Sequence, residues 1–370
     1  MLTFLSAALL IYGTMHFYAL GKVWAAFPHT SALALALVLW GIVMTFSPLL
    51  LWQLARLNLN GTNVVVSWLV YVWMGFLFLF CSIALVCDLG RALATLAGFK
   101  SRLSESMELV SVGFLALAML GYGFVEVRQI QVEKIKITTP KLSPAIGRVT
   151  IAQISDLHLG VMLGGEFLDR VIAKLRELKP DILVATGDIV DGQGDDLNEL
   201  ARHLLTIKPP HGAYAVIGNH EVYAGLEDSI DFLHTAGFNV LRGESAAAGG
   251  IILEGVDDPS AEAAGLGISA DTKKLPASIT NGDFVVLLKH QPVVDKDPPF
   301  DLQLSGHIHG GQIFPFGLFT WLAYGVNTGL TQLADGRRLY VSRGTGTWGP
   351  PIRFMAAPEI TLITIESESK

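Results

Sequence analysis

The chain has 370 residues, of which 51% are hydrophobic, and its mean hydropathy of +0.48 is too high for an ordinary soluble protein. Residues 1–125 carry a charge of about +2, whereas the remainder is acidic and brings the net charge to −7. An acidic second part without a basic run argues against nucleic-acid binding, which depends on Lys and Arg neutralising phosphates. The two cysteines, Cys81 and Cys87, lie in apolar sequence and predict core thiols rather than a disulfide.

Four apolar segments near the N-terminus are long enough to span a bilayer, which takes roughly 20 residues. They cover residues 2–20, 31–52, 65–86 and 109–125. The first lacks the basic start and the cleavage site of a signal peptide, so we expect a retained helix. We therefore predict an integral, multi-pass membrane protein whose residues 1–127 form an anchor of four transmembrane α-helices. These segments contain almost no ionisable residues, which disfavours a transporter.

The segments between and after the spans fit more than one structure. Apolar residues recur at helical spacing at Leu89, Leu93, Leu96, Phe99 and Leu103, which fits either an interfacial helix or a plain loop. Residues 128–147 are typical of an exit linker or of a first edge strand, and residues 148–370 of a catalytic domain. Each side of the membrane would receive four Lys or Arg residues, so the side that carries the catalytic domain stays open.

The central stretch is 151–158, an apolar run that ends in Asp156 and His158. Residues two apart on a strand point to the same side, so both side chains would enter one crevice. A carboxylate and an imidazole at this spacing suit a divalent metal. Taken alone, a helix N-cap Asp beside a surface His explains the pair equally well.

The pattern of a strand followed by polar residues recurs along the second part. We predict strands at 181–185, 213–217, 251–256, 284–288, 302–305, 339–341 and 359–365, with helices at 166–178, 195–207 and 228–236. Alternating strands and helices predict a layered α/β fold with its site at the carboxyl ends of the strands.

Five motifs carry a family resemblance. They are Asp156-Leu157-His158, Gly187-Asp188-Ile189-Val190-Asp191, Gly218-Asn219-His220-Glu221, Lys289-His290 and Gly306-His307-Ile308-His309. In this order they resemble the signature of the calcineurin-like metallophosphoesterases, over residues 148 to about 366. One motif alone would be weak, but five in order are specific. Gly310-Gly311-Gln312 and the loop 342–348 resemble the membrane-associated, transmembrane branch. The resemblance implies a four-layer αββα sandwich.

The resemblance also implies a dinuclear metal centre. One ion would be held by Asp156, His158, Asp188 and His309, and the other by Asp188, Asn219, His290 and His307. Asp188 would bridge two divalent ions, and a metal-activated hydroxide would attack phosphorus. The donors contain no thiolate, which leaves manganese, iron or zinc open. His220 would stabilise the transition state or protonate the leaving oxygen.

Other polar residues are interpreted as supporting or structural. Asp191 is interpreted as a turn residue that supports Asp188, and a supporting role for Gln312 stays open. The remaining histidines, which we interpret as core or surface residues, are His16, His29, His203, His211 and His234.

Two features bear on the substrate. Arg343 and Arg353 flank a glycine-rich loop and could contact a phosphate, although surface salt bridges explain them almost as well. The apolar segment 313–326 fits either a buried connection or a lip that enters the bilayer interface beside the metals.

These observations predict a membrane-anchored phosphohydrolase that cleaves phosphodiester or pyrophosphate bonds, with a lipid-linked substrate as the preferred hypothesis. The alternatives are a phosphoprotein or phosphomonoester phosphatase and a non-catalytic metal-binding membrane scaffold. The scaffold is disfavoured because every expected ligand is present.

Overall fold

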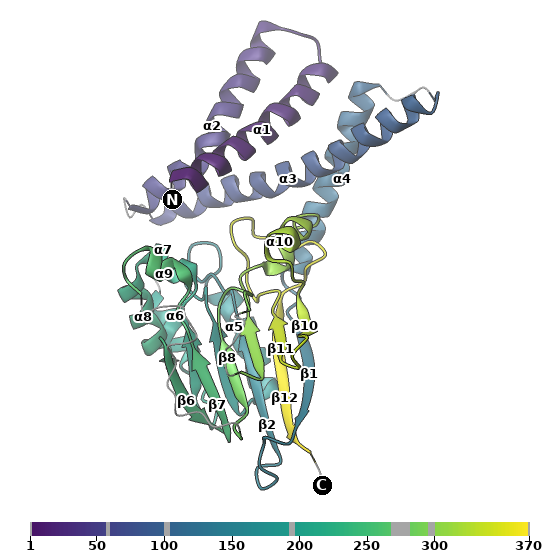
Figure 1. Ribbon diagram of the computed structural model, residues 1–370. Helices are drawn as coiled ribbons and strands as arrows, with labels where there is room; N and C mark the ends of the chain where they lie inside the picture. The colour runs from purple at the N-terminus through teal and green to yellow at the C-terminus, as the bar shows by residue number, and fades with distance from the viewer. Residues whose placement is uncertain are drawn as a thin grey trace. The chain divides into compact units, whose positions relative to one another are not determined.

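The computed structural model describes residues 2–56, 60–99, 104–191, 197–267, 282–294 and 300–368 (Figure 1). The chain forms two compact units. One comprises Met1–Val125 together with Gly349–Phe354, and the other comprises Glu126–Trp348 together with Met355–Lys370.

The first unit is built from four helices, which are α1 (Leu2–Ala26), α2 (Ser31–Arg56), α3 (Asn60–Leu96) and α4 (Glu105–Glu126). Within the described residues, three stretches are long and apolar enough to cross a membrane: Ser31–Leu51, Val64–Leu96 and Glu105–Glu126. The expected first span forms α1 but is not among these three. Three candidate spans are therefore found, and a bundle of four is not confirmed.

The polar residues of this unit pair with one another across helices. Lys22 of α1 lies 2.5 Å from Asp88 of α3 and 2.9 Å from Glu108 of α4. Arg91 of α3 also pairs with Glu108. Residues 89–96 thus belong to α3 and do not form a separate interfacial helix or loop, because their apolar helical spacing continues that of the span.

His16 has the structural role expected of it, whereas the cysteines are not the core thiols expected. The indole N–H of Trp73 donates to Nε2 of the buried His16 at 2.8 Å, so this histidine is satisfied within the unit. Both cysteines are free, but Cys81 is only half-buried and Cys87 is exposed, so neither is a core thiol. Cys87 lies on a candidate membrane span, whose outer surface is also apolar. Apolar neighbours in the sequence therefore do not imply that this residue is buried.

The second unit contains two six-stranded sheets. The first has the order β1 (Gln131–Thr139), β12 (Glu359–Ser367), β2 (Arg148–Ile154), β3 (Ile182–Thr186), β4 (Ala213–Val216), β5 (Asn239–Val240). The second has the order β10 (Gly329–Gln332), β11 (Arg338–Val341), β9 (Leu302–Ser305), β8 (Val285–Leu288), β7 (Ile251–Gly255), β6 (Glu244–Ala248). Strands β2 to β5 are mutually parallel, as are β7, β8, β9 and β11. Residues 128–147 therefore contain the edge strand β1, not a linker alone.

The two sheets share one core, which joins Ile151 and Val184 of the first sheet to Leu253 and Val286 of the second. A second core covers the outer face of the first sheet with α5 (Gly165–Leu178), α6 (Leu197–Leu204) and α8 (Leu226–Thr235). The connection from β7 to β8 includes 268–281, outside the described residues. A mixed α/β unit with two sheets is thus confirmed. The helical layer expected on the outer face of the second sheet stays a prediction.

Strand β7 carries a buried acid, Glu254, whose side chain has no exposed surface. Among the described residues, neither of its carboxylate oxygens has a hydrogen-bond partner. Burial raises the pKa of Glu254 to about 7, because the charged form loses its hydration. The folded protein therefore holds this proton more tightly than the unfolded chain does.

We expect Glu254→Gln to stabilise the protein at pH 8 but not at pH 5. The wild-type residue loses stability as the pH rises from about 4.5 to about 7. The loss reaches at most roughly 3 kcal/mol, or a few degrees in Tm. Thermal unfolding in detergent at both pH values measures it, with the exposed Glu244→Gln on β6 as the control. An equal Tm difference at the two pH values would contradict this assignment.

Candidate metal centre

The candidate ligands lie where parallel strands of both sheets end. Asp156 follows β2, Asp188 follows β3, and Asn219 opens the short helix α7 (Asn219–Ala224) after β4. His290 follows β8, and His307 follows β9. The carboxyl ends of parallel strands form one edge, which is where α/β sheets place their sites.

One group of donors consists of Asp156, His158 and His309, all buried. The Nε2 atoms of the two histidines lie 3.1 Å apart, and Nε2 of His309 lies 3.4 Å from a carboxylate oxygen of Asp156. Nε2 of His158 lies 4.0 Å from Oδ2 of Asp188.

A second group of donors consists of Asp188, His290 and His307. Nε2 of His290 lies 3.1 Å from Oδ2 of Asp188 and 3.1 Å from Nδ1 of His307. The same nitrogen lies 3.2 Å from Oδ1 of Asn219. All seven expected ligands are therefore brought together, and Oδ2 of Asp188 faces both groups.

The donors suit divalent cations. In each group a pair of imidazole nitrogens approaches to 3.1 Å, an arrangement that is satisfied by a proton or a cation between them. Burial and, to a smaller extent, His290 lower the pKa of His307 to about 4, so its ring is neutral as a ligand must be. Carboxylate, amide and imidazole donors without thiolate fit manganese, iron or zinc.

The backbone at the ligands adopts a conformation that side chains usually avoid. A left-handed φ, between 49° and 72°, occurs at Asp156, His158, Asp188, His307 and His309. Each such residue costs of order 1–3 kcal/mol and persists only where the surroundings hold it in place. Backbone hydrogen bonds do this here, for example from Asp156 N–H to Gly187 and from His158 N–H to Asp188. Strain gathered at the ligands marks this edge as a functional site.

Asp191 has a different position from the one expected. Its Oδ1 accepts a hydrogen bond from Nδ1 of His158 at 2.7 Å and lies 2.9 Å from Nδ1 of His220. The carboxylate fixes the His158 ring so that Nε2 points into the ligand group, as partners of metal-bound histidines commonly do. Asp191 thus orients two histidines, which differs from the supporting role toward Asp188 that the motif predicts.

His220 lies beside the ligands with its ring 4.6 Å from that of His158. Burial alone would lower the pKa of His220, but the carboxylates of Asp188 and Asp191 raise it to about 9. The side chain is therefore able to hold a proton at neutral pH, which a general acid requires.

Glu221 holds the loop that carries Asp188. Its buried carboxylate accepts backbone N–H groups from Asp188, Ile189, Val190 and Gly218, at 2.6 to 3.2 Å. Glu221 belongs to one of the five motifs, but its role as an acceptor for four backbone N–H groups is seen only in the structure.

We expect Glu221→Gln to destabilise the protein by about 3 kcal/mol or more, because the amide turns an N–H group toward buried N–H donors. Tm should fall by several degrees, and bound metal, measured by mass spectrometry, should fall with it. Glu227→Gln, an exposed change on α8, is the matched control. An unchanged Tm would show that the four N–H groups do not need the carboxylate.

Tyr324 and Gln312 make further contacts near the donors, of which only the one by Gln312 has a signal in the motif extension. The hydroxyl of Tyr324, at the end of α10 (Gly317–Tyr324), lies 2.6 Å from Nε2 of His307. Gln312 donates to the carbonyl of Trp348 and accepts from its N–H, so it fastens the loop 342–348. The ring of Trp348 lies 5.8 Å from that of His220.

Of the two arginines considered for phosphate binding, one pairs with acids and the other is fully buried. The guanidinium of Arg343 lies 2.6 Å from Glu133 and 2.8 Å from Glu359. Arg353 is fully buried, belongs to the helical unit, and donates its backbone N–H to Gly123. Arg343 thus forms the salt bridges that were the alternative, and neither position supports a phosphate contact.

Comparison with known proteins agrees with this geometry. Residues 149–311 match the calcineurin-like phosphoesterase family. A metallophosphoesterase of Aquifex aeolicus is 39% identical over 259 residues, which cover 69% of this chain and 99% of that protein. One of Helicobacter pylori is 34% identical over 72% of each chain. A transmembrane protein with metallophosphoesterase domain of Danio rerio is 33% identical over 66% of this chain and 60% of its own.

The chain therefore belongs to the calcineurin-like metallophosphoesterases, and the resemblance of the five motifs is confirmed. This is a family of metal-dependent phosphoester hydrolases, and the chain has side-chain clusters that could hold metal. The three apolar helices and the transmembrane relatives indicate a membrane protein.

Proposed function

We propose that the protein is a membrane-anchored phosphohydrolase that uses two divalent ions to cleave phosphodiester or pyrophosphate bonds in a lipid-linked substrate. The observation that supports it most is the position of Asp188, whose Oδ2 faces both groups of donors. One ion would be held by Asp156, His158, Asp188 and His309, and the other by Asp188, Asn219, His290 and His307.

Bound ions supply a hydroxide at neutral pH and polarise the phosphoryl oxygens. The chain's own residues orient the candidate ligands and transfer the proton. Asp191 keeps Nε2 of His158 directed inward, and Glu221 holds the loop of Asp188. His220 carries the proton that the leaving oxygen needs and lies beside the donors, with its second ring nitrogen held by Asp191.

The preference for a lipid-linked substrate rests on two features of the chain. Three of its helices are long and apolar enough to cross a membrane. The apolar segment 313–326 follows the last ligand motif directly, and its Tyr324 contacts His307. A soluble substrate would need neither feature.

Hydrolysis by the full chain, purified in detergent and loaded with Mn²⁺, Fe²⁺ or Zn²⁺, tests the proposal. The substrates are a lipid diphosphate, its water-soluble head-group analogue, bis-(p-nitrophenyl) phosphate and a phosphopeptide. We expect turnover of the diesters and diphosphates, with preference for the lipid. Turnover of the phosphopeptide alone would favour the phosphatase alternative, and no turnover with any metal would favour the scaffold.

A further inference from the structure

We propose that α10 and the segment around it form a lipid-contact surface, which places bilayer lipid next to the candidate metal centre. The inference goes beyond hydrolysis, because a lipid contact can be measured whether or not the protein is active. Of the two alternatives for residues 313–326, a buried connection and a lip in the bilayer interface, we thus favour the second.

Helix α10 lacks the inward-facing side that a helix of a folded domain normally has. None of its eight residues is buried. Leu318 and Phe319 are each 57% exposed, Trp321 is 47% exposed and Leu322 is 71% exposed. Soluble surfaces rarely gather large apolar side chains in this way, and such patches commonly mark an interaction site.

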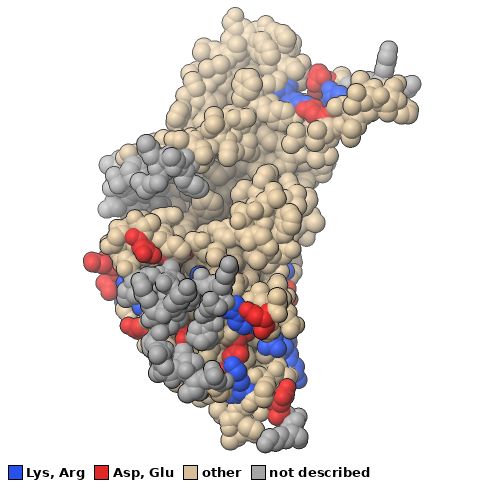
Figure 2. Space-filling model, viewed as in Figure 1, with Lys and Arg blue, Asp and Glu red and all other residues tan. Residues whose placement is uncertain are grey.

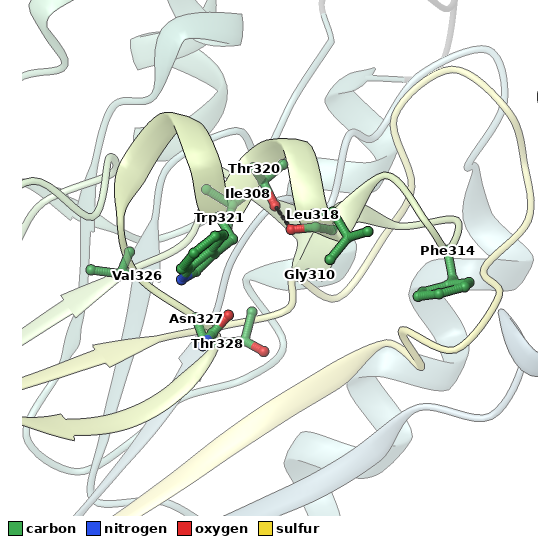
Figure 3. Close-up of a pocket in the computed structure, with 10 residues that line it drawn as sticks. Ile308, Gly310, Phe314, Leu318, Thr320, Trp321, Val326, Asn327 and Thr328 are labelled. Atoms are coloured by element: carbon green, nitrogen blue, oxygen red, sulfur yellow. Dashed lines mark hydrogen bonds between the residues drawn. The ribbon is translucent and has the colours of Figure 1, made fainter.

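The helix also borders a hollow that the described side chains do not fill. A cavity of about 310 Å³ lies there, lined by Ile308, Leu318, Trp321 and Val326 among others. Figure 3 shows Trp321 extending from the helix toward Asn327 and Thr328 at the cavity. The cavity reaches Ile308 and Gly310, which belong to the last ligand motif and its extension.

The chemistry of the segment selects lipid as the occupant. Residues 310–334 contain no Asp, Glu, Lys, Arg or His. Figure 2 shows a surface free of charged side chains over α10 on the face in view. Aromatic residues such as Phe319, Trp321 and Tyr324 are favoured at the boundary between lipid head groups and acyl chains. Because the same chain carries three candidate membrane spans, lipid is a partner that the protein meets.

Tyr324 ties this surface to the site. Its hydroxyl lies 2.6 Å from Nε2 of His307, whose Nδ1 faces His290 in the second ligand group. The helix that we assign to lipid therefore ends on a candidate metal ligand. A phosphate carried by a bilayer lipid would be presented beside the ions rather than delivered from solution.

The direct test measures contact in the full chain. In a Cys81→Ser, Cys87→Ser background, Leu322→Cys labelled with bimane is placed in nanodiscs of phosphatidylcholine and phosphatidylglycerol. Brominated acyl chains should remove roughly half of its fluorescence, since interfacial helices bury their apolar side chains among the lipids. A label at Glu177→Cys, an exposed position on α5, should be unaffected.

Absence of quenching beyond the control would overturn the proposal. A label shielded from both brominated lipid and aqueous iodide would show that α10 packs on protein, either the chain's own helices or a second copy. This readout does not depend on activity, so it stands even if the proposed hydrolysis fails.

A second test compares substrates in the same nanodiscs. Leu322→Glu should lower the ratio of lipid-diphosphate to bis-(p-nitrophenyl) phosphate hydrolysis about tenfold, because a carboxylate at this position disfavours burial of the helix among lipids. Leu205→Glu, another exposed leucine, should leave the ratio unchanged. An unchanged ratio in Leu322→Glu would contradict the role of α10 in presenting lipid, whereas no hydrolysis by the wild type would contradict the proposed function instead.

Discussion

Asp188→Asn should lower phosphodiester hydrolysis by about 1,000-fold or more, which corresponds to roughly 4 kcal/mol of transition-state stabilisation. The reason is geometric: Oδ2 of this one carboxylate lies 3.1 Å from His290 and 4.0 Å from His158. Replacing it removes a negative charge from both groups of donors at once. Loss of either ion would remove the chemistry that the pair supplies.

The measurement is kcat with bis-(p-nitrophenyl) phosphate, together with metal content by mass spectrometry after dialysis. Asp231→Asn, an exposed acid on α8, is the matched control and should behave as the wild type. Full metal content and an unchanged rate in Asp188→Asn would refute the shared role of this residue. A loss of one ion with retained activity would show that a mononuclear site suffices.

His220→Ala should have a comparable effect on rate through a different route. Removing a general acid typically costs 10²–10⁴-fold, so kcat should fall by about 100-fold or more. His220 is not one of the seven proposed ligands, so metal content should stay at the wild-type value. A fall would show that the further cluster of His158, Asp191 and His220 binds an ion. The pair of variants therefore separates metal binding from proton transfer.

The leaving group gives a sharper control. A substrate whose leaving oxygen needs no proton, such as a nitrophenolate ester, should lose less rate in His220→Ala than a substrate with an alkyl leaving group. His211→Ala, an exposed histidine, should not affect either substrate. Equal losses on both substrates would place His220 in transition-state stabilisation rather than in proton donation.

The candidate ligands are held in place by residues outside the two groups of donors. Five of the seven have a left-handed backbone, and Glu221 fastens the loop of Asp188 through four N–H groups. Asp191 orients His158 and His220 together. The stability of the surrounding α/β unit therefore maintains a site whose local conformation is unfavourable by itself.

The sequence by itself determined the features that depend on residue type and spacing along the chain. The candidate membrane spans follow from long apolar runs, and the strands that end in candidate ligands follow from short apolar runs broken by Asp, Asn and His. The predicted strand 302–305 has the bounds that the structure shows. The five ordered motifs also predicted the family. These signals are local, so no knowledge of the partners in space is needed to see them.

Only the tertiary structure decided which side chains meet. Asp191 reaches His158 across 33 residues, and Arg343 reaches Glu133 across 210, through contacts that no local pattern encodes. Tyr324 contacts His307 because it ends helix α10, which lies within the apolar segment 313–326. The composition of this segment fits a buried and an exposed position equally well. The composition of an apolar run shows that it can pack against other apolar groups. Whether it is exposed depends on whether another element of the fold covers it.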